Sequence, residues 1–288
     1  MKENSCSVDD LFAVIVIYKA KLVQSETFVS LNASLKRMNA MMDVLVYDNS
    51  PEPQFNESQF QLENLKITYV HDPSNSGVSR AYNTGAKVAG TMNKKWFIFL
   101  DDDTEFHEDG VEKYIGSVNR NPGYDLFAPI MRMGDLLLSP SKYAWKRGFA
   151  PKEMSPGIAS LLKFHPINSG VMISADLFKR SGGYNEKIRL DFSDFYFMDK
   201  LSKHIQSFVV MDIVMEHSLS GIENRNDTAK LLNGYVNYCI GGKISSESVS
   251  DYVQLFTVVF LRGLLLTYLC RDTKFLSVFL KNFVLYKK

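Results

Sequence analysis

The sequence predicts an α/β fold built on one mostly parallel sheet, and three observations lead to this prediction. Apolar runs of strand length alternate with segments of helical periodicity in the first part of the chain, and strands separated by helices form βαβ units with parallel strands. Polar or turn residues follow each run, at the edge where open α/β sheets bind ligands. The length of 288 residues allows one large domain with an appendage.

The regular elements lie in the first half. Residues 11–18 form a continuous apolar run rich in β-branched and aromatic residues, which is typical of a strand buried on both faces. Apolar residues then recur at helical spacing across residues 27–38. The expected order continues with strands at 42–48 and 65–71, a helix at 78–90 and a strand at 95–100.

The second half is less regular. Residues 107–165 are expected to contain short segments, such as LFAPI and DLLLSP, between loops rich in Gly, Pro, Lys and Arg. Residues 167–184 predict a strand, a short helix and a Gly-Gly turn. An amphipathic helix is expected at 192–204 and a strand at 206–217.

Composition excludes several classes of protein. A net charge of +1 gives no reason to expect nucleic acid as a partner. Cys6, Cys239 and Cys270 are widely spaced, which argues against a disulfide framework or a structural zinc site and favours a reducing cytoplasm. The polar N-terminus predicts no signal peptide, and no uninterrupted apolar run reaches the ~18 residues that span a bilayer.

An acidic cluster follows the strand expected at 95–100. Asp101, Asp102 and Asp103 repel one another, and such a cluster is suited to holding a cation. Magnesium is typically held by one or two carboxylates together with substrate phosphate oxygens. Alternate residues leaving a strand point the same way. We therefore expect Asp101 and Asp103 to face a metal and Asp102 to face a sugar or ribose hydroxyl; the alternative is a solvated acidic turn.

Four motifs occur in a recognisable order: FAVIVIY (12–18), VLVYDNS (44–50), NSGVSRAYNTG (75–85) and FIFLDDDT (97–104). Together they resemble the family 2 glycosyltransferases, which are inverting nucleotide-sugar enzymes with the GT-A fold. The sequence is most similar to the bacterial branch of rhamnosyltransferases and galactofuranosyltransferases. Further matches in INSGVMIS, GGYNEKIRLDFSDFYF and MEHSLSG extend the resemblance over roughly residues 11–221. The branch pattern N-x-G-x-x-x-A-x-N-x-G is matched by Asn75, Gly77, Ala81, Asn83 and Gly85.

The resemblance implies a binding site for a uridine or thymidine diphosphate sugar. Asp48 would accept a hydrogen bond from the base, and Gly77 would let the backbone approach the nucleotide. Asn75 and Asn83 would brace that loop, and Arg80 would reach a phosphate. The set of donor-binding residues also includes Tyr18, Asp101 and Asp102.

The residues alone leave simpler readings open. Asp48 is also suited to an Asx turn, and residues 75–83 to a turn followed by a helix start. Arg80 is equally suited to be a surface cation.

An inverting transfer needs one general base to deprotonate the acceptor hydroxyl. The resemblance places this base at a helix start, within a motif whose branch form F-x-D-x-x-D corresponds to RLDFSDFYF (189–197). It implies Asp194 as the base and Asp191 as its neighbour, although two nearby carboxylates can exchange roles. The alternative is that Asp191 or Ser193 only caps the helix. The sequence departs from the common pattern at Phe195-Tyr196, where a second acid is frequent, and at Lys200, where arginine is usual.

Two histidines lie next to expected strands, His217 at the end of one and His165 before another. His217 matches a histidine that coordinates the metal in related enzymes, and histidine beside carboxylates favours manganese over magnesium. The cofactor is therefore expected to be Mn²⁺ or Mg²⁺. A structural role for His217 is the alternative. His165 precedes the strand expected near residue 167 and is not assigned to the site.

The C-terminal segment has a different character. Residues 252–288 carry six Lys or Arg and one Asp, a net charge of +5, within strongly apolar sequence. This pattern fits one or two helices in the interface of an anionic membrane. The alternative is a helical appendage that packs on the catalytic domain or on a second subunit, as in a homo-oligomer.

These expectations combine into a catalytic domain at 1–221, with a nucleotide-sugar half at 1–105 and an acceptor half at 106–221, followed by a helical segment at 222–288. The predicted function is metal-dependent, inverting transfer of a sugar to a lipid-linked glycan acceptor. The predicted setting is O-antigen or capsule assembly at the inner face of the cytoplasmic membrane.

Two other functions are compatible with parts of this sequence. A nucleotidyltransferase would carry a glycine-rich loop after the first strand, and VIYKAKLVQSE has no glycine. A non-catalytic sugar-nucleotide or lipid-binding subunit would not be expected to retain Asp101, Asp103, Asp194 and His217 together.

Overall fold

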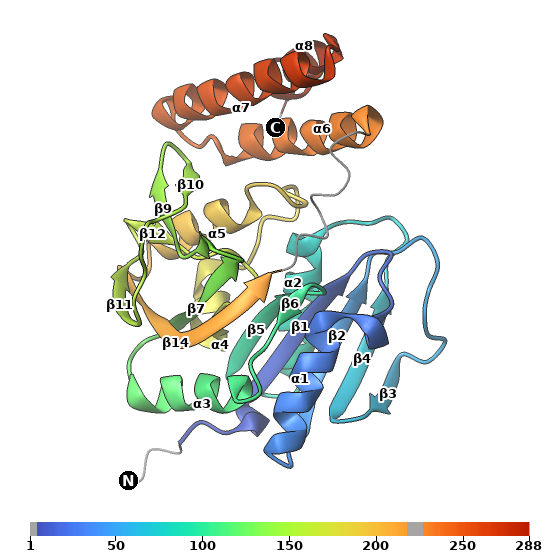
Figure 1. Ribbon diagram of the computed structural model, residues 1–288, viewed down its shortest axis with the longest axis vertical. Coiled ribbons are helices and arrows are strands. Elements are labelled where there is room, and N and C mark those ends of the chain that lie inside the picture. The colour runs from blue at the N-terminus through green and yellow to red at the C-terminus, as the bar shows by residue number, and fades with distance from the viewer. Residues whose placement is uncertain (1–4, 218–226, 288) are drawn as a thin grey trace.

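The centre of the protein is an eleven-stranded sheet with the strand order β11-β14-β7-β13-β5-β1-β2-β4-β3, with β6 beside β14 and β8 beside β7. The computed structural model describes residues 5–217 and 227–287 (Figure 1). The expected α/β fold with a largely parallel central sheet is confirmed. The predicted domain boundary at residue 221 lies outside the described residues.

The predicted strands of the first half form the parallel part of the sheet. They are β1 (Leu11–Ile17), β2 (Met42–Asp48), β4 (Leu65–His71) and β5 (Trp96–Asp101), and they pair in the order β5-β1-β2-β4. All seven residues of β1 are buried, because its alternate side chains belong to two hydrophobic cores on opposite faces of the sheet.

Helices cover both faces of this sheet (Figure 1). The helix α1 (Glu26–Arg37) packs on one face with α3 (Gly110–Arg120), and α2 (Val78–Thr91) packs on the other with α4 (Ala175–Ser181) and α5 (Ser193–Leu201). This arrangement leaves the carboxyl ends of the parallel strands open as a shared edge.

Residues 107–165 are more regular than predicted. They contain α3, whose sequence GVEKYIGSVNR is mostly polar and includes two glycines, so that its helical signal is weak. Val111 and Tyr114 nevertheless anchor the helix because both are fully buried against the sheet. The region also contains six short strands that the sequence patterns did not resolve: β7 (Leu126–Met133), β8 (Leu136–Ser139), β9 (Ser141–Ala144), β10 (Arg147–Phe149), β11 (Gly157–Ser160) and β12 (Phe164–His165). Two further strands outside this region, β3 (Gln59–Leu62) and β6 (Thr104–Glu105), were also not predicted.

Two late strands complete the sheet. β14 (Ser207–His217) lies parallel to β7 and agrees with the predicted strand at 206–217. β13 (Met172–Ser174) is shorter than the strand expected near residue 167 and runs antiparallel between β5 and β7. The chain before β13 is therefore free to form a loop at the carboxyl end of β5.

The C-terminal helices pack against the α/β body. They are α6 (Thr228–Ser245), α7 (Val249–Cys270) and α8 (Lys274–Phe279), followed by a π-helical turn at Leu280–Val284. Their apolar core includes Ile188 and Phe192 from the body. We call these helices and the terminal turn the C-terminal cap.

Polar contacts also join the cap to the body. Lys146 lies 2.8 Å from Asp199 of α5 and 3.0 Å from Asp251 of α7. Glu247 accepts hydrogen bonds from the Tyr196 hydroxyl at 2.8 Å and from Lys203 at 3.1 Å. The cap thus packs on the α/β body through both apolar and polar contacts.

The helix α7 is long and apolar enough to cross a membrane by length and composition alone. It has 22 residues and a mean hydropathy of 1.8, although Arg262 interrupts its apolar run. Only 17 % of this apolar window is buried, so most of the apolar surface of α7 faces outward from the protein.

Candidate active site

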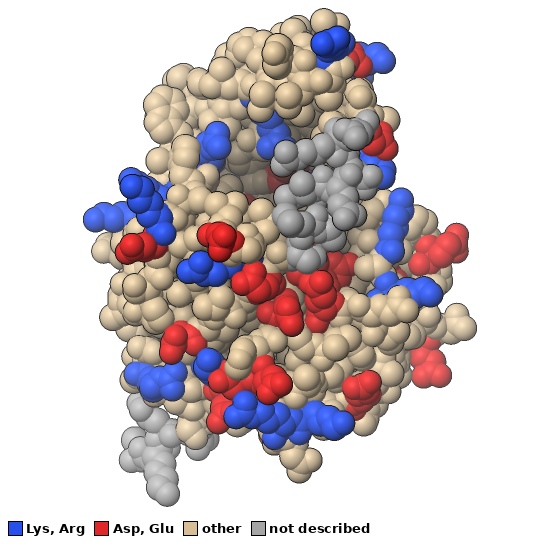
Figure 2. Space-filling model, in the orientation of Figure 1, with Lys and Arg blue, Asp and Glu red and all other residues tan. Residues whose placement is uncertain are grey.

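Two connected cavities lie at the carboxyl edge of the parallel strands. The larger, of about 500 Å³, is called here the acidic cleft because Asp101, Asp102 and Asp103 line it. The smaller, of about 310 Å³, is called the Asp194 pocket, and it shares Val78, Asp101 and Leu190 with the cleft. Figure 2 shows a hollow between the cap and the body with acidic side chains within and below it. The polar residues of the acidic cleft are completed by Tyr18, Asn49, Asn75, Arg189, His217 and Asn237.

Buried hydroxyls fix the backbone of the acidic turn. The Thr27 hydroxyl donates to the Asp101 carbonyl at 2.5 Å and accepts from the Thr104 N–H at 3.0 Å. The Ser169 hydroxyl accepts from the Asp101 N–H at 3.2 Å and lies 2.6 Å from the Thr104 hydroxyl. These contacts hold the turn through Thr27 at the start of α1 and Ser169 in the loop before β13, and no sequence motif pointed to either residue.

The three acidic side chains do not follow the period-two alternation that we expected. Alternation ends at Asp101, the last residue of β5, and Asp102 and Asp103 form a turn before β6. All three line the acidic cleft. Asp102 and Asp103 also face an adjoining open groove beside Lys19 and Lys21, while Asp101 faces the Asp194 pocket. The expected separation of Asp102 from the other two is therefore corrected.

Proton affinity in this turn is unusually high. Burial, followed by the charge of Asp103, raises the pKa of Asp101 to about 6. Burial also raises the pKa of Asp102 to about 6, with further contributions from both neighbouring carboxylates. Burial and, to a smaller extent, the neighbouring carboxylates thus disfavour the ionised forms of Asp101 and Asp102, and a bound cation would favour these ionised forms.

His217 reaches the acidic turn from the end of β14. Its Nδ1 lies 3.2 Å from Asp103 Oδ1, because β14 pairs with β6 at Thr104. Within residues 5–217 and 227–287, no three His, Cys, Asp or Glu side chains converge in an arrangement that could hold a metal ion. The Asp103–His217 pair, with Asp101 in the same cleft, fits a cation that takes its remaining ligands from a phosphate group.

Gly77 has a reason for being glycine that differs from the expected one. Its φ is +91°, and a Cβ atom there would lie 2.1 Å from the Arg189 carbonyl oxygen. The same carbonyl accepts the Val78 N–H at 2.9 Å. Close approach to Arg189 therefore requires glycine, whether or not a nucleotide is bound. Asn75, at φ +49°, lines the cleft beside it.

Asp48 lies beneath the cleft and not on its wall. It is fully buried, and its carboxylate accepts the Ser50 N–H at 2.9 Å and the Tyr69 hydroxyl at 2.7 Å. These are the contacts of an Asx turn, the simpler reading of this residue. The next residue, Asn49, lines the cleft, and its Oδ1 is buried with no hydrogen-bond partner among the described residues. Asn49 is thus a candidate for ligand recognition that sequence reasoning missed.

Arg80 and Asn83 lie away from the acidic cleft. Arg80 pairs with Glu186 at 3.1 Å. Asn83 donates to the Tyr184 carbonyl and to Glu186, both at 3.0 Å, and so braces the loop after α4 instead of the loop at Asn75. Among the described residues, the arginine that lines the cleft is Arg189. Its position becomes apparent only in the fold, where its backbone lies against Gly77.

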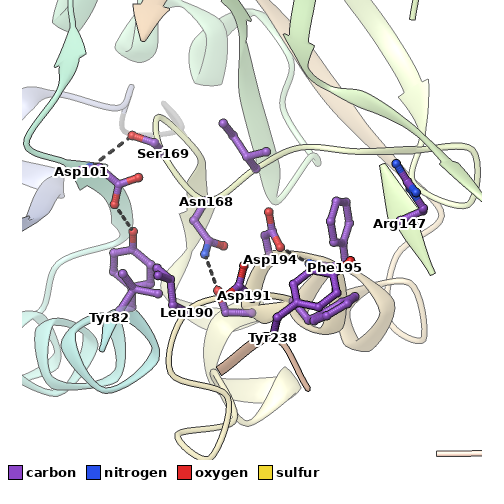
Figure 3. Close-up of a pocket in the computed structure, with 14 residues that line it drawn as sticks. Tyr82, Asp101, Arg147, Asn168, Ser169, Leu190, Asp191, Asp194, Phe195 and Tyr238 are labelled. Atoms are coloured by element: carbon purple, nitrogen blue, oxygen red, sulfur yellow. Dashed lines mark hydrogen bonds between the residues drawn. The ribbon is translucent and has the colours of Figure 1, made fainter. Parts of the chain in front are cut away.

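Asp194 lies in the first turn of α5, on the wall of its pocket (Figure 3). Its carboxylate accepts the Phe195 N–H at 2.8 Å. Burial, followed by the nearby Asp191, raises the pKa of Asp194 to about 6. The pKa of Asp191 is also raised by burial, although Arg262 partly offsets this. A carboxyl with a pKa near 6 is suited to accept a proton at neutral pH.

The backbone at this helix start is strained. Phe192, the residue before α5, has a φ of +67°, which is a rare conformation for a bulky residue. Its ring lies 4.6 Å from that of Tyr238 of the cap. Packing by the cap therefore helps to hold the segment that carries Asp191 and Asp194.

Two other residues considered from sequence have structural contacts. His165 is buried and stacked on Tyr143 with ring centroids 3.6 Å apart, and burial lowers its pKa to about 3. It lines neither cavity. Lys200, which stands where arginine was usual, donates to the Gly183 carbonyl and fixes the Gly-Gly turn.

An open α/β sheet with acidic residues at its carboxyl edge, and further carboxylates in an adjoining pocket, is the arrangement of the GT-A fold. Comparison with solved structures supports this fold. S. aureus TarS in complex with UDP-GlcNAc superposes with a TM-score of 0.56 at 11 % identity, over 94 % of this chain and 79 % of that one. The mannosyltransferase PcManGT from Pyrobaculum calidifontis, in complex with GDP-Man and Mn²⁺, gives a TM-score of 0.52 at 12 % identity, over 93 % and 73 % of the two chains.

Sequence comparisons assign the family. Residues 13–174 match the model of glycosyl transferase family 2. The dTDP-rhamnosyl transferase RfbF of Shigella flexneri is 23 % identical over 213 residues, which cover 73 % of this chain and 69 % of that protein. The chain belongs to glycosyl transferase family 2, as the four sequence motifs indicated, and its class of chemistry is sugar transfer.

Proposed function

We propose that this protein transfers a sugar, with inversion at the anomeric carbon, from a uridine or thymidine diphosphate donor to a glycan acceptor. One observation carries the proposal. The acidic cleft and the Asp194 pocket share a wall at Asp101, so that a donor in the first cavity and an acceptor in the second would meet there. The similarity to a dTDP-rhamnosyl transferase favours a deoxyhexose donor.

The acidic cleft supplies the groups that a nucleotide donor needs. Asn49 and Tyr18 offer polar contacts to the nucleoside, and Arg189 offers a positive charge to the diphosphate. Asp103 and His217, with Asp101 beside them, would hold a divalent cation. When bound, Mn²⁺ or Mg²⁺ would neutralise the charge that develops on the departing diphosphate.

Asp194 performs the proton transfer in this proposal. Its carboxylate takes the proton from the acceptor hydroxyl while the hydroxyl oxygen forms a bond to the anomeric carbon. The bond between the anomeric carbon and the diphosphate oxygen breaks in the same step, and its electron pair leaves with the nucleoside diphosphate. Because attack and departure occur on opposite faces of the sugar, the configuration inverts. Asp191 shapes the site without taking the proton.

A thermal-shift panel tests the donor proposal. Uridine, thymidine and guanosine diphosphate sugars are each added with Mn²⁺ and again with EDTA. We expect a rise in Tm for a uridine or thymidine compound that depends on the metal. Stabilisation by none of these compounds, or by a guanosine compound alone, would overturn the proposed donor class.

We further propose that the outer face of α7 binds an anionic membrane surface, where a lipid-linked acceptor would be met. Val253, Leu261, Leu265 and Tyr268 share this face at helical spacing, and each is more than half exposed. The net charge of +5 in residues 252–288 would attract anionic lipid. This placement corresponds to the inner face of the cytoplasmic membrane and to a role in surface polysaccharide assembly, either O-antigen or capsule.

Vesicle co-sedimentation tests the membrane proposal. The protein is expected to bind phosphatidylglycerol vesicles more strongly than phosphatidylcholine vesicles, and Leu261→Ser/Leu265→Ser should release it. Val29→Ser provides the matched control, since Val29 is equally exposed but lies on α1. Equal binding by the double variant would refute a docking role for this face, and dimerisation of the wild-type protein through it would assign the face to a second subunit.

A further inference from the structure

The end of the Asp194 pocket farthest from Asp101 has its own composition. It is formed by Phe195 of α5, Tyr238 of the cap and Arg147 of β10. Figure 3 shows Asp101 and Arg147 at opposite ends of the pocket, with Asp191 and Asp194 between them. This end is not part of the acidic cleft, and the proposed transfer chemistry does not use it.

Tyr238 is held firmly in this position. The Arg262 guanidinium carbon lies over its ring at 4.3 Å, and the Phe192 ring lies 4.6 Å away. The helix that carries Tyr238 packs so closely on the Asp191 segment that only glycine fits at position 241, where a Cβ atom would lie 2.6 Å from the Asp191 carbonyl oxygen. A fixed aromatic ring beside a carboxylate offers an apolar face and a polar hydroxyl, which suits the mixed surface of a sugar ring.

The charges of the pocket are unequally distributed. Three carboxylates, those of Asp101, Asp191 and Asp194, lie toward one end and in the middle. Arg147 is exposed at the other end, and among the described residues it makes no ion pair; its guanidinium lies 4.7 Å from the Phe149 ring centroid. Its neighbour Lys146, in contrast, is engaged by Asp199 and Asp251. Arg147 is therefore the cation that remains available to a ligand in this pocket.

We propose that this end of the pocket is an acceptor subsite for a sugar that carries a phosphate group, with the ring on Tyr238 and the phosphate at Arg147. The proposal rests on the proposed function, because it assumes that the attacking hydroxyl lies near Asp194. The guanidinium of arginine matches phosphate oxygens in a bidentate geometry. A sugar placed in this way extends from Asp194 toward Arg147 and directs its anionic group away from the three carboxylates.

Calorimetric titration with two sets of probes tests the subsite. One set comprises the 1-phosphates of glucose, galactose, N-acetylglucosamine and rhamnose, and the other comprises the methyl glycosides of the same sugars. We expect at least one 1-phosphate to bind about tenfold more tightly than its methyl glycoside. Arg147→Ala should abolish this preference without weakening the glycoside, and Arg147→Lys should retain part of it. Tyr238→Leu should weaken both probes by the same factor.

The controls separate this proposal from the proposed function. Arg120→Ala removes an exposed arginine of α3 and should change neither probe. Uridine or thymidine diphosphate should bind with the same affinity to the wild type and to all variants. If the wild-type protein binds neither nucleotide, this result counts against the proposed function and not against the subsite. Absence of a phosphate preference in the wild type, its persistence in Arg147→Ala, or binding of no probe would overturn the subsite. A farnesyl diphosphate-linked form of the preferred sugar then distinguishes the sources of phosphate: tighter binding than the 1-phosphate indicates a lipid carrier, and equal binding a soluble ester, both at the same subsite.

Discussion

The acidic cleft and the Asp194 pocket share a wall but are assembled in different ways. The acidic cleft comes mainly from the carboxyl ends of consecutive parallel strands, with His217 added from β14. The Asp194 pocket draws its residues from α2, the loop before β13, the start of α5, the β10 strand and the cap. The first cavity follows from strand order, whereas the second depends on how separate parts of the chain pack together.

This difference has a mechanical consequence. The acidic turn is fixed by a hydrogen bond that the Thr27 hydroxyl donates to the Asp101 carbonyl and by one that the Ser169 hydroxyl accepts from the Asp101 N–H. The segment that carries Asp194 is fixed by Phe192. The backbone of Phe192 is strained, and its ring packs against Tyr238 of the cap. Asn237 is the one residue among those described that the cap contributes to the acidic cleft. We therefore expect donor binding to be insensitive to changes in the cap away from Asn237, and we expect the catalytic step to depend on the cap.

The largest expected effect comes from Asp194→Asn. Without the general base, sugar transfer should fall by about 10²–10⁴-fold, while the affinity for the nucleotide donor remains unchanged because Asp194 lies outside the acidic cleft. Steady-state kinetics and nucleotide titration measure the two quantities. Asp191→Asn is the matched comparison, with a smaller expected loss. Full transfer by Asp194→Asn would exclude it as the base, and a larger loss in Asp191→Asn would exchange the two roles.

A change in the acidic cleft is expected to affect metal-dependent donor binding, in contrast to the change in the Asp194 pocket. Asp103→Asn removes the carboxylate beside His217 and should weaken the activating effect of Mn²⁺ by roughly a hundredfold. The measurement is the Mn²⁺ concentration that gives half-maximal donor binding. Asp109→Asn, which removes an acid at the start of α3, provides a control. An unchanged Mn²⁺ requirement in Asp103→Asn would separate Asp103 from the metal.

Sequence motifs predicted the acidic cleft better than the Asp194 pocket. Asp101, Asp102, Asp103 and His217 lie together, because strand ends in a parallel sheet meet at one edge. Local patterns also placed Asp194 at a helix start, although they did not reveal the left-handed Phe192 before it.

Tertiary contacts explain what the sequence could not reveal. Arg189 enters the cleft because its backbone packs on Gly77, more than a hundred residues earlier in the chain. Tyr238 enters the Asp194 pocket because α6 packs on the segment at Asp191. Neither contact has a local sequence signal. Arg80 lies within a sequence motif, but it pairs with Glu186 and does not line the acidic cleft.

The pH dependence of transfer should report the Asp194 pocket. Only the ionised carboxylate can accept a proton, so kcat/KM should fall about tenfold per pH unit below the Asp194 pKa of about 6. Ionisation of Asp194 has the opposite effect on folding stability: it raises kcat/KM but lowers the free energy of unfolding. Because burial raises this pKa above the usual value, ionisation of Asp194 destabilises the folded state as pH rises from about 4 through 6. Asp194→Asn should therefore raise Tm at pH 7.5 but not at pH 4. A kcat/KM that stays level down to pH 4.5 would contradict the raised pKa.

The smallest expected effect is on kcat and comes from a substitution in the cap. It tests whether the cap positions the Asp194 segment without affecting the acidic cleft. Gly241→Ala places a Cβ atom 2.6 Å from the Asp191 carbonyl oxygen, whereas a Cβ atom at Gly234, on the same helix, meets nothing within 4 Å. Both substitutions raise helix propensity equally, so a difference between them isolates the contact with Asp191. Gly234→Ala should raise Tm and leave kcat unchanged. Gly241→Ala should lower kcat by about three- to tenfold, because displacement of a catalytic segment by a fraction of an ångström already costs rate, while nucleotide affinity stays constant. If the two variants have the same kcat, the cap does not position the segment that carries Asp194; if Gly241→Ala weakens nucleotide binding instead, the two cavities are coupled through their common wall.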